Sequence, residues 1–107
     1  MSEVLELERI LDKAAGRPYH EFLRVPAMSA GIYVLQAGAA DRQHPHKEDE
    51  IYYVVRGKAK MRLGAEERPV QEGSVIFVES NLEHRFFNIE EDLVLLVVFA
   101  PAETSDE

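Results

Sequence analysis

The 107-residue chain has no cysteine and no tryptophan, and its basic residues are outnumbered by acidic ones. Without cysteine there are no disulfide bonds, thiolate ligands or cysteine nucleophiles, so any metal ion must be held by imidazole, carboxylate or backbone oxygen atoms. Twelve lysine and arginine residues against twenty aspartate and glutamate residues give a net charge of -8. This charge repels phosphate backbones, and we therefore expect no nucleic-acid partner.

Long apolar segments are also missing. No stretch approaches the roughly 18 to 20 apolar residues that a membrane-spanning helix needs, so no membrane association is expected. The first residues, MSEVLELER, are acidic where a secretory signal would be basic, which predicts a cytoplasmic protein. With 46% hydrophobic and 30% charged residues, the composition is typical of one globular domain with a buried core.

Hydrophobic spacing predicts one short helix followed only by strands. Residues 3–14 carry apolar side chains at helical intervals, with Ser2 as the N-cap, and Gly16 and Pro18 end the pattern. The predicted strands are short, rich in β-branched and aromatic residues, and separated by turn residues: Ala30–Gln36, Ile51–Arg56, Ala59–Leu63, Val75–Val78, Arg85–Asn88 and Leu93–Phe99. Such a series indicates an all-β sandwich or barrel. The last strand is apolar at every position, so both of its faces should be covered.

Three regions follow from this pattern. Residues 1–18 form the helix and a linker, residues 19–100 form the β-barrel, and residues 101–107 form a carboxy-terminal tail. The tail has no core-forming residues, and we expect it to be mobile.

Most of the residues that could bind a metal ion lie between Gly38 and Gly57. His44 and His46 are two residues apart, so on an extended chain they point to the same face and can converge on one ion. Glu50 follows at the entrance to a predicted strand and can add a carboxylate. A third imidazole must come from elsewhere in the fold, and His84, which opens another predicted strand, is the natural candidate.

This arrangement resembles the cupin superfamily. Its first motif, G(x5)HxH(x3,4)E(x6)G, is matched at every fixed position, by Gly38, His44, His46, Glu50 and Gly57. Its second motif, G(x5)PxG(x2)H(x3)N, is matched by Gly73, His84 and Asn88, whereas Glu79 replaces the proline and Asn81 replaces the glycine. Asparagine tolerates the left-handed backbone region, so Asn81 can keep the turn that glycine would serve.

The resemblance implies a double-stranded β-helix, also called a cupin barrel or jelly roll, with one metal ion inside and pairing of two chains as a homodimer. The ligands would be His44, His46, Glu50 and His84, and they leave two positions free on a six-coordinate ion, which favours catalysis over a purely structural role. Divalent iron, manganese, nickel, cobalt and zinc all accept these ligands, so the identity of the metal stays open.

Three functions are compatible with such a site. The first is a dioxygenase-like enzyme acting on a small organic acid or enolate, in which Glu50 is a ligand and also a catalytic base. The second is a redox-neutral, metal-dependent isomerase or lyase in which the ion polarises a carbonyl group. The third is a non-catalytic module that binds or senses a small molecule. Glu50 and the absence of cysteine both point away from the thiol dioxygenases of the superfamily.

Two aromatic residues share the inward phase of the predicted ligands. Tyr52 follows Glu50 by two residues, and Phe86 follows His84 by two, so each could line a substrate pocket or pack in the core. The remaining histidine, His20, is expected to be a surface or packing residue.

Overall fold

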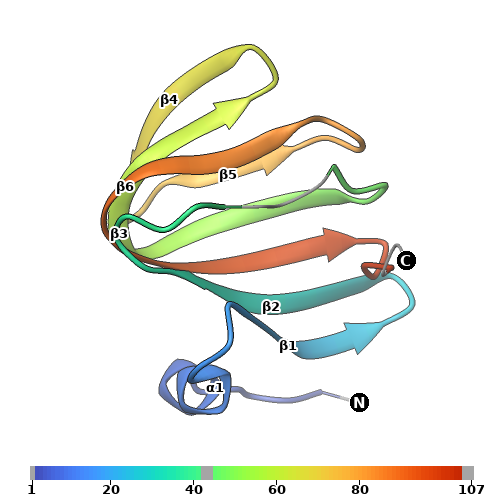
Figure 1. Ribbon diagram of the computed structural model, residues 1–107. Helices are drawn as coiled ribbons and strands as arrows, with labels where there is room; N and C mark the ends of the chain where they lie inside the picture. The colour runs from blue at the N-terminus through green and yellow to red at the C-terminus, as the bar shows by residue number, and fades with distance from the viewer. Residues whose placement is uncertain (1, 42–44, 105–107) are drawn as a thin grey trace.

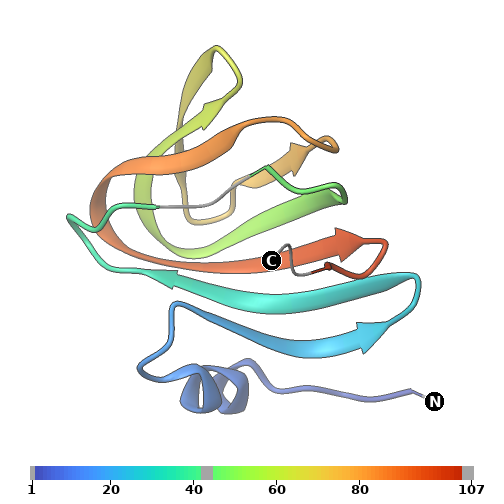
Figure 2. The ribbon, with the colours of Figure 1, turned by 45° about the vertical axis from the view of Figure 1, so that its right-hand side comes forward.

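The computed structural model describes residues 2–41 and 45–104. The described residues form one helix, α1 (Leu7–Ala14), and six strands, β1 (Tyr19–Val25), β2 (Met28–Leu35), β3 (Asp49–Leu63), β4 (Glu66–Gln71), β5 (Val75–Val78) and β6 (His84–Ala100). The pairings of these strands are antiparallel, and the strands join in the order β1-β2-β6-β3-β4, with β5 also paired to β3. The sheet curls on itself into an open barrel (Figures 1 and 2). The predicted all-β architecture is therefore confirmed.

The two long strands, β3 and β6, form the centre of the sheet. They pair from Asp49–Ala100 at one end to Leu63–His84 at the other. We predicted two shorter strands in each of these regions, with a turn at Gly57 in the first, and this was wrong. Gly57 has a φ of +107° and lies in a stretch of register shifts, and a β-carbon at this position would collide with the carbonyl oxygen of Asp92. The glycine therefore allows a bulge and a close approach of two strands, without ending either one.

Two edge strands, β1 and β4, were absent from the prediction. Among the described strands, β1 pairs only with β2, and β4 pairs only with β3. Their residues are partly or fully exposed, apart from the buried Val70 of β4. Because edge strands need no clean apolar alternation, and β4 even contains Pro69, the hydrophobic pattern did not reveal them.

Helix α1 begins at Leu7, four residues later than predicted. Glu6 occupies the N-cap position, and its side chain makes no capping hydrogen bond in the described part of the chain. Val4 is 88% exposed, so its apolar side chain is not covered by the described part of the chain. Only Ile10 and Ala14 of the helix are buried. Since helices of this length depend on tertiary packing, the helix forms only where it meets the sheet.

The core lies on both sides of β6. Alternate residues of this strand, from Leu93 to Phe99, point into the barrel and pack with side chains of β3 such as Tyr52 and Val54. On the outer side, Val94 packs with Ile10 of α1 and Ile32 of β2. Both faces of the apolar run are therefore covered, as predicted.

The outer face of β3 and β5 is apolar and is left uncovered by the described residues. Ile51 pairs with Phe77 and Tyr53 pairs with Val75, and these four side chains are 41% to 67% exposed. The helix of the described ranges is too short and too polar to span a membrane.

Candidate metal centre

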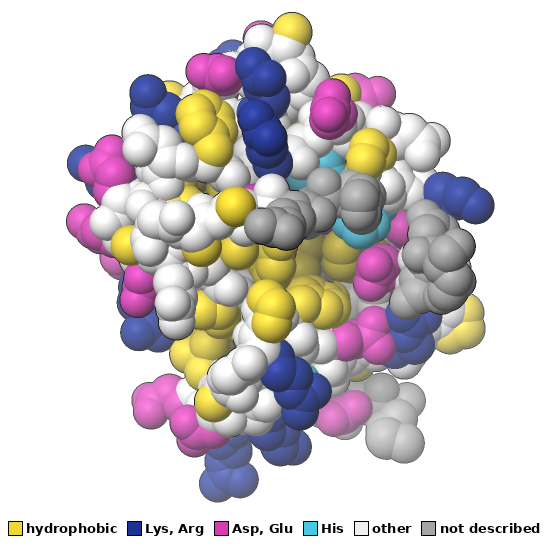
Figure 3. Space-filling model, in the orientation of Figure 1, with side chains coloured by type: hydrophobic (Ala, Val, Ile, Leu, Met, Phe, Trp, Pro, Cys, Tyr) yellow, Lys and Arg dark blue, Asp and Glu magenta, His cyan; other side chains and the backbone are white. Residues whose placement is uncertain are grey.

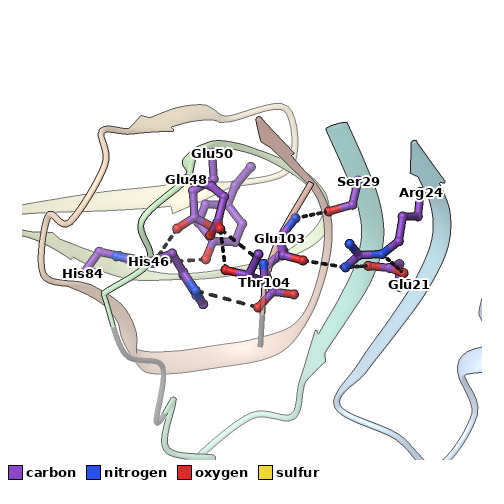
Figure 4. Close-up of polar contacts among 10 residues, drawn as sticks. Glu21, Arg24, Ser29, His46, Glu48, Glu50, His84, Glu103 and Thr104 are labelled. Carbon is purple, nitrogen blue, oxygen red and sulfur yellow. Dashed lines mark hydrogen bonds and ion pairs between the residues drawn. The ribbon is translucent and has the colours of Figure 1, made fainter. Parts of the chain in front are cut away.

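Three of the four predicted ligands meet inside the barrel. Glu50 lies on β3, where the neighbouring side chains of Asp49 and Ile51 are exposed and that of Glu50 points inward and is buried. His84 is the first residue of β6 and is also buried. His46 lies in the segment before β3, and its ring is 5.9 Å from that of His84 between centroids. One ligand atom of each of the three residues lies within 4.8 Å of the others (Figure 4). His44 lies outside the described residues, and its part in the site stays a prediction.

The loop before β6 holds the two motifs together. The backbone N–H of Asn81 donates to the carbonyl oxygen of His46 at 2.6 Å, and the Ser80 hydroxyl donates to the Lys47 carbonyl oxygen at 2.6 Å. The Ser80 N–H donates to Asp49 at 2.8 Å. Asn81 has a φ of +64°, so it keeps the left-handed turn as predicted. The loop therefore fixes the position of the His46 segment relative to His84.

The Glu50 carboxylate and the His84 ring face each other in a way that calls for a positive charge. His84 Nδ1 lies 2.8 Å from the Leu82 carbonyl oxygen, which can only accept, so Nδ1 carries a proton. In the neutral ring, Nε2 then directs a lone pair at Glu50 Oε1, 2.9 Å away. Among the described residues, neither oxygen of Glu50 receives a hydrogen bond from a neutral donor. Two opposed lone pairs at this distance need a proton or a metal cation between them.

The same contact shifts the basicity of His84. Burial lowers the pKa of the imidazole, but the hydrogen bond to Glu50, the bond to the Leu82 carbonyl and the charges of Glu50 and Asp41 outweigh burial and raise the pKa above its ordinary value. A protonated ring therefore satisfies the pair when no metal is bound. A divalent cation would satisfy the same two atoms and would also use the imidazole of His46, so the residues fit such an ion.

A cavity of about 200 Å³ adjoins the centre. Its walls are mostly aromatic and apolar, and the lining residues are Tyr19, Tyr33, His46, Tyr52, Val97, Phe99 and Glu103. Figure 3 shows a hollow with hydrophobic walls and histidine side chains beside it. Tyr52 lines the cavity, and its hydroxyl lies 3.3 Å from His84 Nε2. Phe86 is not part of this lining. It is buried in the core and meets the ring of Tyr52 edge-on at 5.1 Å.

The carboxy-terminal residues Glu103 and Thr104 contact the barrel, which the sequence did not indicate. The Glu103 N–H donates to the buried Ser29 hydroxyl at 2.9 Å, and the Arg24 guanidinium donates to the Glu103 carbonyl oxygen. Both the N–H and the hydroxyl of Thr104 donate to Glu48, at 3.2 and 2.9 Å. Figure 4 shows these contacts on the side of the barrel where His46 and Glu50 lie. The acidic tail resembled a solvated segment, and no motif distinguished these residues.

The side chain of Glu103 reaches the candidate site. Its Oε2 lies 3.8 Å from His46 Nδ1. Burial, followed by the charges of Glu48 and Glu21, raises the pKa of Glu103, although His46 and Arg24 act in the opposite direction. A carboxylate beside the second nitrogen of a ligand histidine is a common way to orient the ring.

Asp41 is a second residue whose contacts sequence reasoning missed. It is buried, with one oxygen accepting from the Tyr33 hydroxyl at 2.7 Å and the other from the Phe86 N–H at 2.8 Å. These bonds tie the segment that precedes the histidine motif to β2 and β6. Aspartate in a polar loop is ordinarily solvated, so its type and position carried no signal.

Comparison with known proteins agrees with this architecture. An uncharacterized protein of Streptomyces coelicolor, SCO3923, is 46% identical over 100 residues, which make up 94% of this chain and 92% of that protein. The crystal structure of TT1209 from Thermus thermophilus is 26% identical, with a TM-score of 0.77 over 94% of this chain and 99% of that chain. A Klebsiella pneumoniae protein with a double-stranded β-helix domain shares the fold, with 16% identity and a TM-score of 0.80 over 99% of this chain and 100% of its own.

A family model described as the cupin domain matches residues 31–99, which contain Glu50, His84 and both histidines of the first motif. This range runs from β2 to the last inward-facing residue of β6 and so includes both central strands. The chain therefore belongs to the cupin family and has its double-stranded β-helix fold.

Proposed function

We propose that the protein is a mononuclear metal enzyme that acts on a small organic acid or enolate. The observation that carries this proposal is the buried Glu50 carboxylate, which faces a lone pair of His84 at 2.9 Å and has no neutral hydrogen-bond donor among the described residues. A buried carboxylate in this state is costly unless a cation balances it. His44, His46, Glu50 and His84 would hold the ion.

The cavity beside the centre sets the size and chemistry of the substrate. Its volume of about 200 Å³ is below the range of drug-sized ligand pockets, so it suits a molecule of few atoms. Burial raises the pKa of both Tyr19 and Tyr33, so both hydroxyls stay protonated. The Tyr33 hydroxyl donates to Asp41, whereas the Tyr19 hydroxyl can donate to a substrate. When bound, the metal would polarise the substrate oxygens and, if it is iron, exchange electrons with dioxygen. Glu50 is placed to act as a base if its bond to the metal loosens.

Dioxygenase-like chemistry is the first reaction we propose. The walls of the cavity are mostly apolar and aromatic and offer water few hydrogen-bond partners, which suits a reaction whose reactive species must be protected from hydrolysis. The protonated Tyr19 hydroxyl favours a second candidate, a redox-neutral isomerase or lyase, because a donor of this kind stabilises an enolate without any oxidant. Consumption of dioxygen distinguishes the two reactions.

Elemental analysis tests the metal site directly. Wild-type protein purified without a metal-affinity tag should contain about one divalent ion per chain, and the His44→Ala/His84→Ala double variant should contain none. His20→Ala is the matched control, because this histidine lies on β1, away from the three clustered ligands, and should leave the metal content unchanged.

The outcome decides the next assay. Iron would direct us to oxygen-uptake measurements with small oxo and hydroxy acids, whereas zinc, manganese, nickel or cobalt would call for isomerase and lyase assays as well. No metal in the wild type, even after reconstitution, would contradict the proposal and favour a non-catalytic binding module.

A further inference from the structure

The hydroxyl of Tyr19 is a buried polar group without a hydrogen-bond partner among the described residues. Tyr19 opens β1 and lines the cavity beside His46 and Phe99, and its oxygen is shielded from solvent. The hydroxyl of Tyr33, whose ring meets that of Tyr19 edge-on at 6.2 Å, donates to Asp41. A buried hydroxyl without an acceptor is destabilising, so its retention points to a ligand that supplies the acceptor.

Gly31 creates the space that the Tyr19 ring occupies. A β-carbon on Gly31 would collide with the hydroxyl oxygen and two ring carbons of Tyr19. Gly31 pairs with Val97, another residue of the cavity wall, so the hydroxyl lies over the cavity side of the sheet. Glycine inside a strand weakens the strand and marks a close approach of another group. Here the close approach is that of the Tyr19 hydroxyl.

The surrounding charges limit which acceptor can bind. Burial, then the charges of Glu103 and Glu21, raises the pKa of Tyr19, so the phenol keeps its proton and can donate it to an acceptor. Glu103 also lines the cavity and already supplies a carboxylate there. Beside the Tyr19 hydroxyl, where no metal would balance its charge, a carboxylate of the ligand would be repelled by Glu103, whereas a neutral carbonyl or hydroxyl oxygen would not.

We propose that Tyr19 anchors the substrate: its hydroxyl donates a hydrogen bond to a neutral oxygen of a small oxo or hydroxy acid whose carboxylate is held at the metal centre. This assignment rests on the proposed metal site and deepens it. The substrate class is a short-chain acid with a second, uncharged oxygen acceptor.

The test compares wild type with Tyr19→Phe, which removes only the hydroxyl. Both proteins are loaded with cobalt(II), their metal content is measured, and acids are titrated by calorimetry in pairs matched in chain length. The pairs are pyruvate with propanoate, 3-oxobutanoate with butanoate, and 4-oxopentanoate with pentanoate. Within each pair, the two acids differ only in the additional acceptor oxygen.

At least one oxo acid should bind wild type about tenfold more tightly than its plain partner, which is the size of one buried hydrogen bond. This preference should disappear in Tyr19→Phe, while the plain acids bind both proteins alike. Tyr19→Phe should melt at the same temperature as wild type or higher, because it removes a buried donor that no described residue accepts from. A hydroxyl with a structural role alone would leave the preference unchanged.

Gly31→Ala provides an independent variant. Its methyl group would displace the Tyr19 ring, so the same preference should be lost although position 19 is still tyrosine. Succinate should bind no more tightly than butanoate, and tighter binding would overturn the assignment of a neutral acceptor.

The outcomes separate the two proposals. A wild-type protein that retains no cobalt after reconstitution would overturn the proposed function and this inference with it. If the wild type holds cobalt but shows no preference for any oxo acid, this inference alone is overturned. The same holds if the wild type shows the preference and Tyr19→Phe keeps it unchanged.

Discussion

At the scale of single residues, the contact between Glu50 and His84 links protonation, metal binding and stability. The proton that bridges them in the metal-free protein occupies the place that a metal cation would take. Metal affinity should therefore fall as the pH is lowered, because the cation competes with protons for the imidazole groups. The same proton also contributes to the stability of the metal-free fold.

The metal-free protein should lose stability as the pH rises. Because the pKa of His84 is raised in the folded state, the protonated ring stabilises the fold fully below its unfolded pKa of about 6.5. This contribution is lost as the pH rises through the folded pKa. Denaturant melts in the presence of a chelator, between pH 6 and pH 9, should show this decrease.

Glu50→Gln is the control for this pH dependence, because it removes the carboxylate that raises the pKa of His84. Its stability should vary less with pH over the same range. Wild-type stability that stays level or increases with pH would contradict the bridging proton.

Residue types and spacing predicted three residues that do converge, His46, Glu50 and His84. Metal ligands are recognisable because few side chains can serve and their spacing follows strand geometry. Asp41 and Glu103 were missed because each acts through contacts with residues distant in sequence. An acidic residue in a loop looks the same whether it is solvated or buried against such a partner.

At the scale of elements, the loop between β5 and β6 controls the position of the candidate ligands. Its Ser80 and Asn81 hold the segment from His46 to Asp49 through three short hydrogen bonds. The left-handed conformation of Asn81 directs its N–H toward His46. Stability and metal affinity should therefore respond together to substitutions at this position.

Asn81→Ala should lower the free energy of unfolding by about 1 kcal/mol, because alanine tolerates the left-handed region less well than asparagine. It should also weaken metal binding through the His46 segment. Asn81→Gly should retain both properties, since glycine adopts this conformation freely. Thermal melts and metal titrations measure the two effects, and an alanine variant identical to wild type in both would refute the role of the loop.

Element boundaries were less predictable than element types. The apolar strand at the end of the chain and the short helix were evident from periodicity. The bulges that keep β3 and β6 continuous were not, because Gly57 and the polar residues near Asp92 look like turns in sequence. These residues form bulges and not turns because β3 and β6, which are distant in sequence, pair with each other.

At the scale of the whole molecule, self-association stays a prediction from the family resemblance. A homodimer would give a sedimenting mass of twice the 12.2 kDa chain at micromolar concentration. Sedimentation velocity on the metal-loaded and metal-free protein checks this, with a single monomer peak as the contrary result. Equal masses in the two states would show that assembly does not depend on the metal.

The position of β6 in the sheet has a consequence for synthesis on the ribosome. β6 lies between β2 and β3, yet it is the last of the described strands to be made. Until its 17 residues emerge, the β1–β2 hairpin and the β3–β4–β5 group have no common partner among the described strands, and both expose apolar surface and unpaired edges.

At roughly 5 to 20 residues per second, translation of β6 prolongs this state by on the order of one to three seconds. The described sheet can therefore be completed only after β6 has been made. A message truncated before His84 would give two sheet fragments that lack the strand joining them, and such fragments are substrates for chaperones and proteases.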